Sequence, residues 1–209
     1  MITIGTPTTG VGSSAGGDDY TLSHEVVAGT KVLVVGVAAV YSSGNGATSA
    51  KWNGTSMDTA AEYNEGSTAA IFYIRNPEVG TFNVAIHDDN GAGHAGSSPR
   101  IFAVNLSDQV IGTRIGATAT GDSVDQTYVV QGTAGVVFDV FIGDTTATLD
   151  ADHTSIWSNQ AIGSDKTAAS YITHSGSNVT TDHGADGDPT YAGAEFMEGT
   201  DFAAQILIV

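Results

Sequence analysis

The sequence predicts an all-β protein, an antiparallel β-sandwich of jelly-roll type with little or no helix. Three observations lead to this prediction. Short runs of Val, Ile, Phe, Tyr and Thr recur along the 209 residues, and these residue types suit a pleated, half-buried surface. Each run is closed by Gly, Asn or Asp, which supply the backbone angles of turns. No apolar pattern of comparable weight repeats at the spacing of a helix.

The expected strands follow one another at turn-bounded intervals. In chain order they are 20–27, 31–40, 69–75, 79–87, 100–106, 128–131, 136–142 and 202–209. The run 31–40 is apolar on both faces, which predicts a central strand covered on each side. Alternate apolar residues at Phe82, Val84 and Ile86 predict a half-exposed strand. About a dozen short strands at this spacing predict two packed antiparallel sheets.

Three local features complete this expectation. Asn53-Gly54 stands between strand-like residues and predicts a tight hairpin. The segment 57–65 contains neither Gly nor Pro and has capping-box spacing at Thr59 and Glu62, which favours a short helix. Its Thr and Tyr content suits a strand equally well, so the sequence leaves both alternatives for this segment. The apolar run 202–209 is expected to pair inside a sheet, because an exposed apolar edge would invite aggregation.

The chain divides into a short N-terminal segment and one domain. Residues 1–17 are rich in Gly, Ser and Thr and predict an extended arm or linker. Ile2 and Ile4 would be its apolar anchors and Pro7 a stiff point, so the arm could add a strand to a neighbouring subunit. Alternatively, Ile2 and Ile4 form the first strand of the domain's own sandwich. Residues 18–209 show no shift in composition and predict a single β-sandwich domain.

The charge of the chain excludes some classes of function. There are 23 acidic residues against six Lys or Arg, a formal net charge of -17. Such a surface repels phosphate, so binding to nucleic acid through basic patches is not expected.

The absence of Cys excludes a disulfide framework. The first residues lack the features of a signal peptide, and no apolar run approaches the roughly 20 residues of a membrane span.

Clustered acidic residues and histidines raise the question of a metal. Hard cations such as calcium take carboxylate oxygens from flexible loops. The weak calcium candidates are Asp88, Asp89, Asp182, Asp186 and Asp188. These candidates fall into two clusters, 88–89 and 182–188, and neither cluster follows an EF-hand or a zinc-protease pattern. Solvated turn residues are therefore the favoured interpretation, and no metal or other cofactor is expected.

No catalytic motif is present, and the chain is not expected to be an enzyme. The segment after Gly54 lacks the G-x-S-x-G elbow of serine hydrolases. Sugar binding without chemistry is more plausible, because Trp52 and Trp157 could offer stacking faces to a sugar ring. The competing interpretation, and the favoured one, is that both tryptophans fill the core or close the ends of the sandwich, since aromatic residues dominate cores as well as interfaces.

The order of the strand-like segments resembles a known module. The residues that carry the resemblance are the segments 32–37, 50–57, 70–77, 80–86, 100–108 and 135–140. Together they are similar to the jelly-roll type of β-sandwich found in virion proteins of tailed bacteriophages and in bacterial surface proteins. The similarity extends over residues 20–209 and includes no catalytic residue.

The resemblance implies a structural virion protein. The role expected from it is a capsid decoration, or cement, protein on the outer surface of a phage head, made in the host cytoplasm. Its expected partners are the major capsid protein and copies of itself in a homotrimer, with neither nucleic acid nor membrane. The alternative is a carbohydrate-binding module for host attachment, as a tail or fibre part or a lectin-like domain of a bacterial surface.

Overall fold

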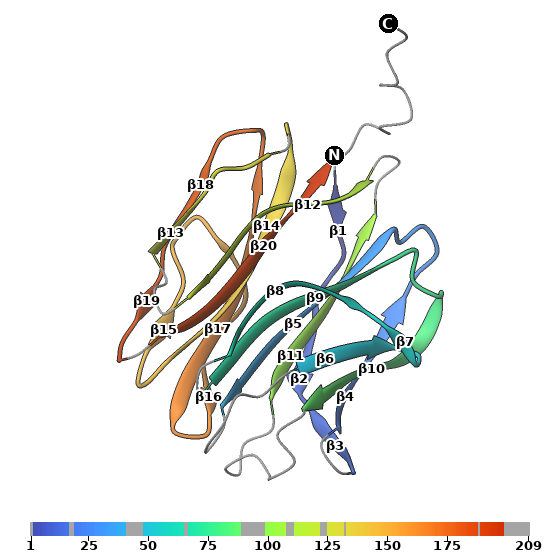
Figure 1. The fold of residues 1–209 in the computed structure, drawn as a ribbon, viewed down its shortest axis with the longest axis horizontal. Coiled ribbons are helices and arrows are strands. Elements are labelled where there is room, and N and C mark those ends of the chain that lie inside the picture. Colours follow the sequence, from blue (N-terminus) through green and yellow to red (C-terminus); the bar gives the residue numbers. More distant parts are fainter. Residues whose placement is uncertain are drawn as a thin grey trace, which may run out of the picture.

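The computed structural model describes residues 2–16, 19–40, 48–64, 67–88, 99–107, 111–121, 125–131, 133–187 and 189–198. Every regular element in these residues is a β-strand, and all strand pairs are antiparallel (Figure 1). The predicted fold class, an all-β protein with packed antiparallel sheets, is confirmed. Among the described residues there is no helix of the length and apolar character needed to cross a bilayer.

The first half of the chain forms two sheets. Sheet A contains β1 (Thr3–Ile4), β2 (Thr8–Val11), β5 (Val32–Val40), β8 (Asp58–Asn64), β9 (Ser67–Arg75) and β11 (Arg100–Ser107). Sheet B contains β3 (Ser13–Gly16), β4 (Asp19–Val26), β6 (Thr48–Trp52), β7 (Thr55–Ser56) and β10 (Gly80–Asp88). The spatial orders β2-β11-β5-β9 and β4-β10-β6-β7 are those of an eight-stranded jelly roll, because successive strands cross repeatedly between the two sheets.

The second half repeats this scheme. Sheet C contains β12 (Ile111–Gly121), β14 (Gly135–Gly143), β16 (Thr154–Ile162), β17 (Asp165–His174) and β20 (Thr190–Glu198), in the order β12-β20-β14-β17-β16. Over it lies a cover of two strand pairs, β13 (Asp125–Tyr128) with β18 (Val179–Asp182) and β15 (Ala147–Thr148) with β19 (Gly184–Ala185). The order β12-β20-β14-β17-β16 of sheet C thus corresponds to the order β2-β11-β5-β9-β8 of sheet A, and the cover takes the place of sheet B.

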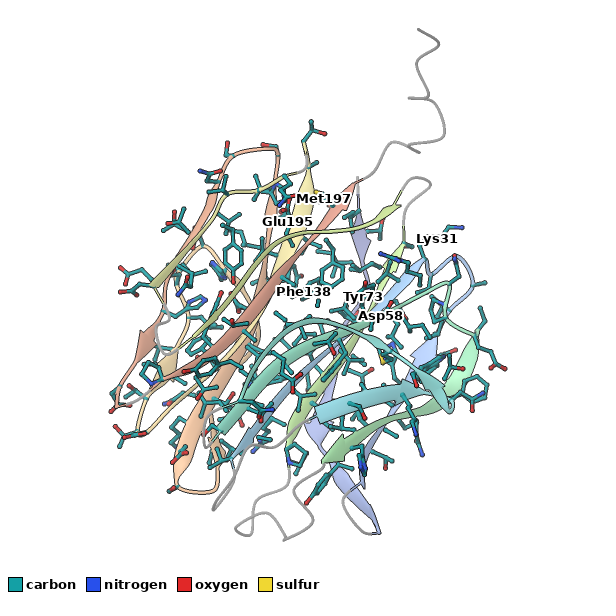
Figure 2. All side chains as sticks on the ribbon, in the orientation of Figure 1. Lys31, Asp58, Tyr73, Phe138, Glu195 and Met197 are labelled. Atoms are coloured by element: carbon teal, nitrogen blue, oxygen red, sulfur yellow. The ribbon has the colours of Figure 1, made fainter. Side chains whose placement is uncertain are left out.

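The two halves stack into four layers, in the order sheet B, sheet A, sheet C and cover. Three apolar clusters fill the three interfaces between them. Phe138 of sheet C and Tyr73 of sheet A lie where the two halves meet (Figure 2). The sequence predicted two sheets, and the difference has a physical cause: strands β5 and β14 are buried on both faces and each requires a layer on either side.

Two local expectations are decided by the structure. Asn53 and Gly54 both have positive φ, 45° and 81°, and close the predicted hairpin between β6 and β7. In the segment 57–65, for which both a helix and a strand were possible, residues 58–64 form strand β8 at the edge of sheet A. The predicted strand 202–209 lies outside the described residues.

The N-terminal segment is part of the domain rather than a free arm. Strands β1 and β2 both pair with β11 in sheet A, and Ile2 belongs to the apolar cluster between sheets A and C. Ile4 packs against the same cluster, and Pro7 lies in the connection between the two strands. Residues 2–11 therefore follow the alternative of strands in the domain's own sandwich, because β1 and β2 pair with β11 and Ile2 is buried within its own chain.

Deleting residues 1–10 should consequently destabilise the isolated protein. We expect a loss of about 3 kcal/mol, since burial of one Ile side chain alone contributes about 2 kcal/mol and the pairing with β11 is lost as well. Thermal unfolding of the purified protein measures this, with Thr6→Ala in the exposed connection as a control that should change little. A melting temperature unaffected by the deletion would contradict the assignment.

Candidate functional site

The most unusual feature of the interior is a buried polar cluster between sheet C and the cover. Its centre is Asp139, in the middle of β14, whose side chain is 0% exposed. Alternation along β14 turns Phe138 and Val140 toward sheet A and Asp139 toward the cover. Ser170 on β17 and Gly193 on β20 are the residues directly opposite Asp139.

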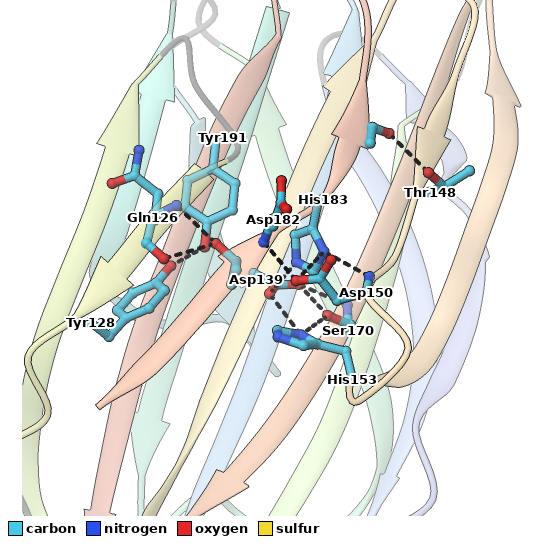
Figure 3. Close-up of polar contacts among 12 residues, drawn as sticks. Gln126, Tyr128, Asp139, Thr148, Asp150, His153, Ser170, Asp182, His183 and Tyr191 are labelled. Atoms are coloured by element: carbon cyan, nitrogen blue, oxygen red, sulfur yellow. Dashed lines mark hydrogen bonds and ion pairs between the residues drawn. The ribbon is translucent and has the colours of Figure 1, made fainter. Parts of the chain in front are cut away.

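Hydrogen bonds hold the carboxylate of Asp139 on both oxygens (Figure 3). Ser170 donates to Oδ1 twice, from its backbone N at 3.1 Å and from its Oγ at 2.6 Å. His183, in the cover between β18 and β19, places its Nε2 3.0 Å from Oδ2. The Nδ1 of His183 accepts from the backbone N of Asp150 at 3.1 Å, so the ring proton is on Nε2 and is donated to Asp139.

A second histidine, His153, contacts the same carboxylate from the other side. Its Nδ1 is 2.8 Å from Ser170 Oγ and 3.4 Å from Asp139 Oδ2. The single hydroxyl proton of Ser170 is donated to Asp139, so the Nδ1 of His153 is the donor to Ser170. The side chain of His153 is fully buried, and its Nε2 has no hydrogen-bond partner among the described residues.

The electrostatics follow from this arrangement. Burial alone would raise the pKa of Asp139, but hydrogen bonds from His153, His183 and Ser170 hold it well below its usual range. Burial alone would lower the pKa of His153. The hydrogen bond to Asp139 and the carboxylates of Asp139, Asp152 and Asp150 outweigh burial, and the pKa of His153 is raised.

Two tyrosines extend the buried polar layer. The hydroxyl groups of Tyr128 on β13 and Tyr191 on β20 hydrogen-bond to one another (Figure 3). Burial raises the pKa of both. Gly193 makes room for the pair, since a Cβ there would overlap the hydroxyl group of Tyr128 and lie 2.9 Å from that of Tyr191.

A separate buried pair lies at the far end of the same interface. Glu195 on β20 accepts from the backbone N of Gln131, at 3.0 Å and 3.2 Å to its two oxygens. Its Oε1 is 3.1 Å from the Nε2 of His174. His174 also borders a groove of about 550 Å³, together with Ile2, Gly135 and Asp152.

Four acidic residues, Asp125, Asp150, Asp152 and Asp182, form an acidic rim on the outer side of the central cluster. Asp150 and His153 close a turn, with the backbone N of His153 3.3 Å from the carbonyl oxygen of Asp150. Asp150 Oδ2 accepts from the backbone N of Asp182 at 2.6 Å. Asp125 stands directly opposite Asp182 on the paired strands β13 and β18. The hydrogen bond with Asp182 is the largest cause that raises the pKa of Asp125, followed by burial and by the negative charges of Asp182 and Asp150.

This chemistry is not arranged for catalysis. Ser170, His153 and Asp139 have the residue types of a hydrolase triad, but Ser170 donates to the Asp rather than to the His. All three residues are buried beneath the cover. A nucleophile must reach its substrate, so we interpret these bonds as interior polar packing.

Of the predicted metal candidates, the structure describes the side chains of Asp182 and Asp186, and these two have different hydrogen-bond partners. Asp182 lies in the acidic rim, whereas the carboxylate of Asp186 accepts from the backbone N of Thr145 and Thr146, both at 2.8 Å, and closes a turn. Asp88 ends β10, and its side chain is outside the described part of the structure, as are Asp89 and Asp188.

The predicted sugar-stacking residues are in the core. Trp52 is 1% exposed and its Nε1 donates to the carbonyl oxygen of Glu78 at 3.0 Å. Trp157 is 8% exposed and packs edge-on to Phe102, with ring centroids 5.7 Å apart. The prediction of an exposed platform from these two residues is wrong, because each ring fills an interface between layers.

The sequence analysis missed Asp139, His153 and His183 as one cluster. A signal was present, because Asp139 interrupts the apolar run 136–142 and a charge within a buried strand needs partners. The partners themselves come from segments 14 and 44 residues away and carry no local mark. Comparisons with protein-family models, with curated proteins and with solved structures found no match.

Proposed function

We propose that this chain is a structural virion protein, a decoration protein on the outer surface of a phage capsid. One observation carries the proposal: two jelly-roll halves stack on each other with filled interiors, and Asp139 at the centre of the buried polar cluster is hydrogen-bonded by Ser170 and His183. A protein with this architecture would act as a structural component, through contacts made by its outer surface and through its rigidity. Jelly rolls are used by viral capsid proteins and by lectins, so this step is an analogy at the level of fold.

The charge supports the same role. With 23 acidic residues against six basic ones, the charge of the protein would keep it away from packaged nucleic acid. The partners we propose are the major capsid protein and two further copies of this chain. A trimer suits the three-fold positions of a shell, where symmetric contacts can cover the edges of the sheets.

The copy number in purified particles tests this proposal. Quantitative mass spectrometry of virions from the natural source should find the chain at a number comparable to that of the major shell protein. A few copies per particle would place it in the tail or a fibre, and its absence from particles would overturn the proposal. Light scattering of the purified protein should give three times the 21.2 kDa chain mass.

The carbohydrate-binding alternative has no support from the two tryptophans. Its two stacking residues, Trp52 and Trp157, are buried, and a sugar ring needs an open aromatic face.

A further inference from the structure

The acidic rim and the side chain of His153 lie at the same place in the fold. A ring nitrogen of His153 and carboxylate oxygens of Asp150 and Asp152 lie within 4.8 Å of one another. All three residues belong to the turn of residues 150–153, which the hydrogen bond from His153 to Asp150 closes. Asp152 is exposed and borders the groove of about 550 Å³, so the turn can be reached from solvent.

His153 itself points to a ligand. Its side chain is 0% exposed, yet Nε2 lacks a partner in the described structure. A buried polar atom without a partner costs about 1–3 kcal/mol, and an ion bound at that atom would remove the cost. This observation is independent of the acidic residues.

The other side of the His153 ring is already prepared as in a metal site. Its Nδ1 donates to Ser170, and the carboxylate of Asp139 lies 3.4 Å from the same nitrogen. Histidine ligands commonly donate their second ring N–H to a carboxylate or to another fixed acceptor, which orients the ring and leaves the lone pair of the other nitrogen for the metal. Here the two acceptors are held in the interior by β14 and β17.

The inner group of Asp139, His153 and His183 also has residue types that suit a metal ion. It is excluded as the metal site because the nitrogen of His183 that faces Asp139 carries a proton. The Nε2 of His183 carries the proton that Asp139 accepts, because Nδ1 is occupied by the backbone N–H of Asp150. A protonated nitrogen cannot bind a metal ion. The outer group leaves this hydrogen-bonded core intact.

We propose that Asp150, Asp152 and the Nε2 of His153 bind a divalent transition-metal ion, with Zn²⁺ as the best fit. Two carboxylates and one imidazole suit zinc, whereas calcium takes oxygen ligands alone. Bonds of about 2.1 Å place two ligand atoms of a tetrahedral zinc ion about 3.4 Å apart, so ligand atoms that lie within 4.8 Å of one another need to approach by about 1.4 Å at most. The opposed pair Asp125 and Asp182 adds negative charge beside the site, which like-charge pairing makes unfavourable without a cation.

Metal titration of the full chain tests the proposal. After treatment with a chelator, isothermal titration calorimetry with Zn²⁺ should give one site per chain, and Ca²⁺ should bind at least tenfold more weakly. Co²⁺ should give a visible absorption spectrum of nitrogen and oxygen coordination. No Zn²⁺ binding, or Ca²⁺ binding as tight as Zn²⁺ binding, would overturn the proposal.

Variants locate the ion. Asp152→Asn should weaken Zn²⁺ binding at least tenfold while the protein stays folded, because Asp152 is exposed. Asp58→Asn, at an exposed position of β8, is the matched control and should bind as the natural protein does. If Asp152→Asn retains the full affinity, the ion is bound elsewhere and the assignment is wrong. These results do not depend on whether the protein decorates a capsid.

Discussion

Asp139→Asn should destabilise the protein by about 3–5 kcal/mol, the range observed when one partner of a buried charged network is removed. The groups around this carboxylate are all donors: the Ser170 backbone N and Oγ, and the ring nitrogens of His183 and His153. An Asn side chain replaces one acceptor oxygen by an NH₂ group. Either orientation of the amide therefore sets a donor against a donor in the interior.

Urea unfolding followed by circular dichroism measures this effect. Asp58→Asn removes the same charge from an exposed position and should change stability by less than about 0.5 kcal/mol. A loss below about 1 kcal/mol in Asp139→Asn would show that the buried cluster contributes little to the fold.

The same variant should alter the acid side of the stability profile. The pKa of Asp139 is lower in the folded than in the unfolded protein, so its contribution is complete above the unfolded pKa, near 4, and is lost as the pH falls. In Asp139→Asn this loss is absent, and stability should fall less steeply below about pH 4.

Gly36→Ala should be the second most damaging substitution, with a loss of about 2–3 kcal/mol from overpacking. Gly36 lies opposite Phe102 in sheet A, and an added Cβ would overlap that ring, with Cδ1 2.7 Å away. The ring cannot move aside easily. It packs on Phe138 and Trp157 across the interface with sheet C, at centroid distances of 5.9 Å and 5.7 Å.

A double-mutant cycle tests the cause. In a background of Phe102→Leu, the cost of Gly36→Ala should fall by more than 1 kcal/mol, because the smaller side chain leaves space for the new methyl group. Gly10→Ala is the control, since the nearest atom to a Cβ there is the flexible methyl group of Leu22, at 2.8 Å. Equal costs in both backgrounds would contradict the steric explanation.

Two predictions from the sequence had different outcomes, because one depended on local backbone angles and the other on which sheet covers a strand. The hairpin at Asn53-Gly54 was predictable because positive φ at two successive residues is a local requirement. The role of Ile2 and Ile4 was not, because alternating apolar residues show that a face is buried but not which sheet covers it. A free arm and a first strand have the same sequence pattern.

The sequence by itself determined the all-β class, the positions of β4, β5, β9, β10, β11 and β14, and the covering of 31–40 on both faces, since these depend on residue type and on a period of two. Only the tertiary structure decided that there are four layers, that Trp52 and Trp157 are buried, and that Asp139 meets His153 and His183. These features depend on which strands pair and which sheets stack. Such pairings join residues distant in the chain, and their free energy is set by packing between layers rather than by local preference.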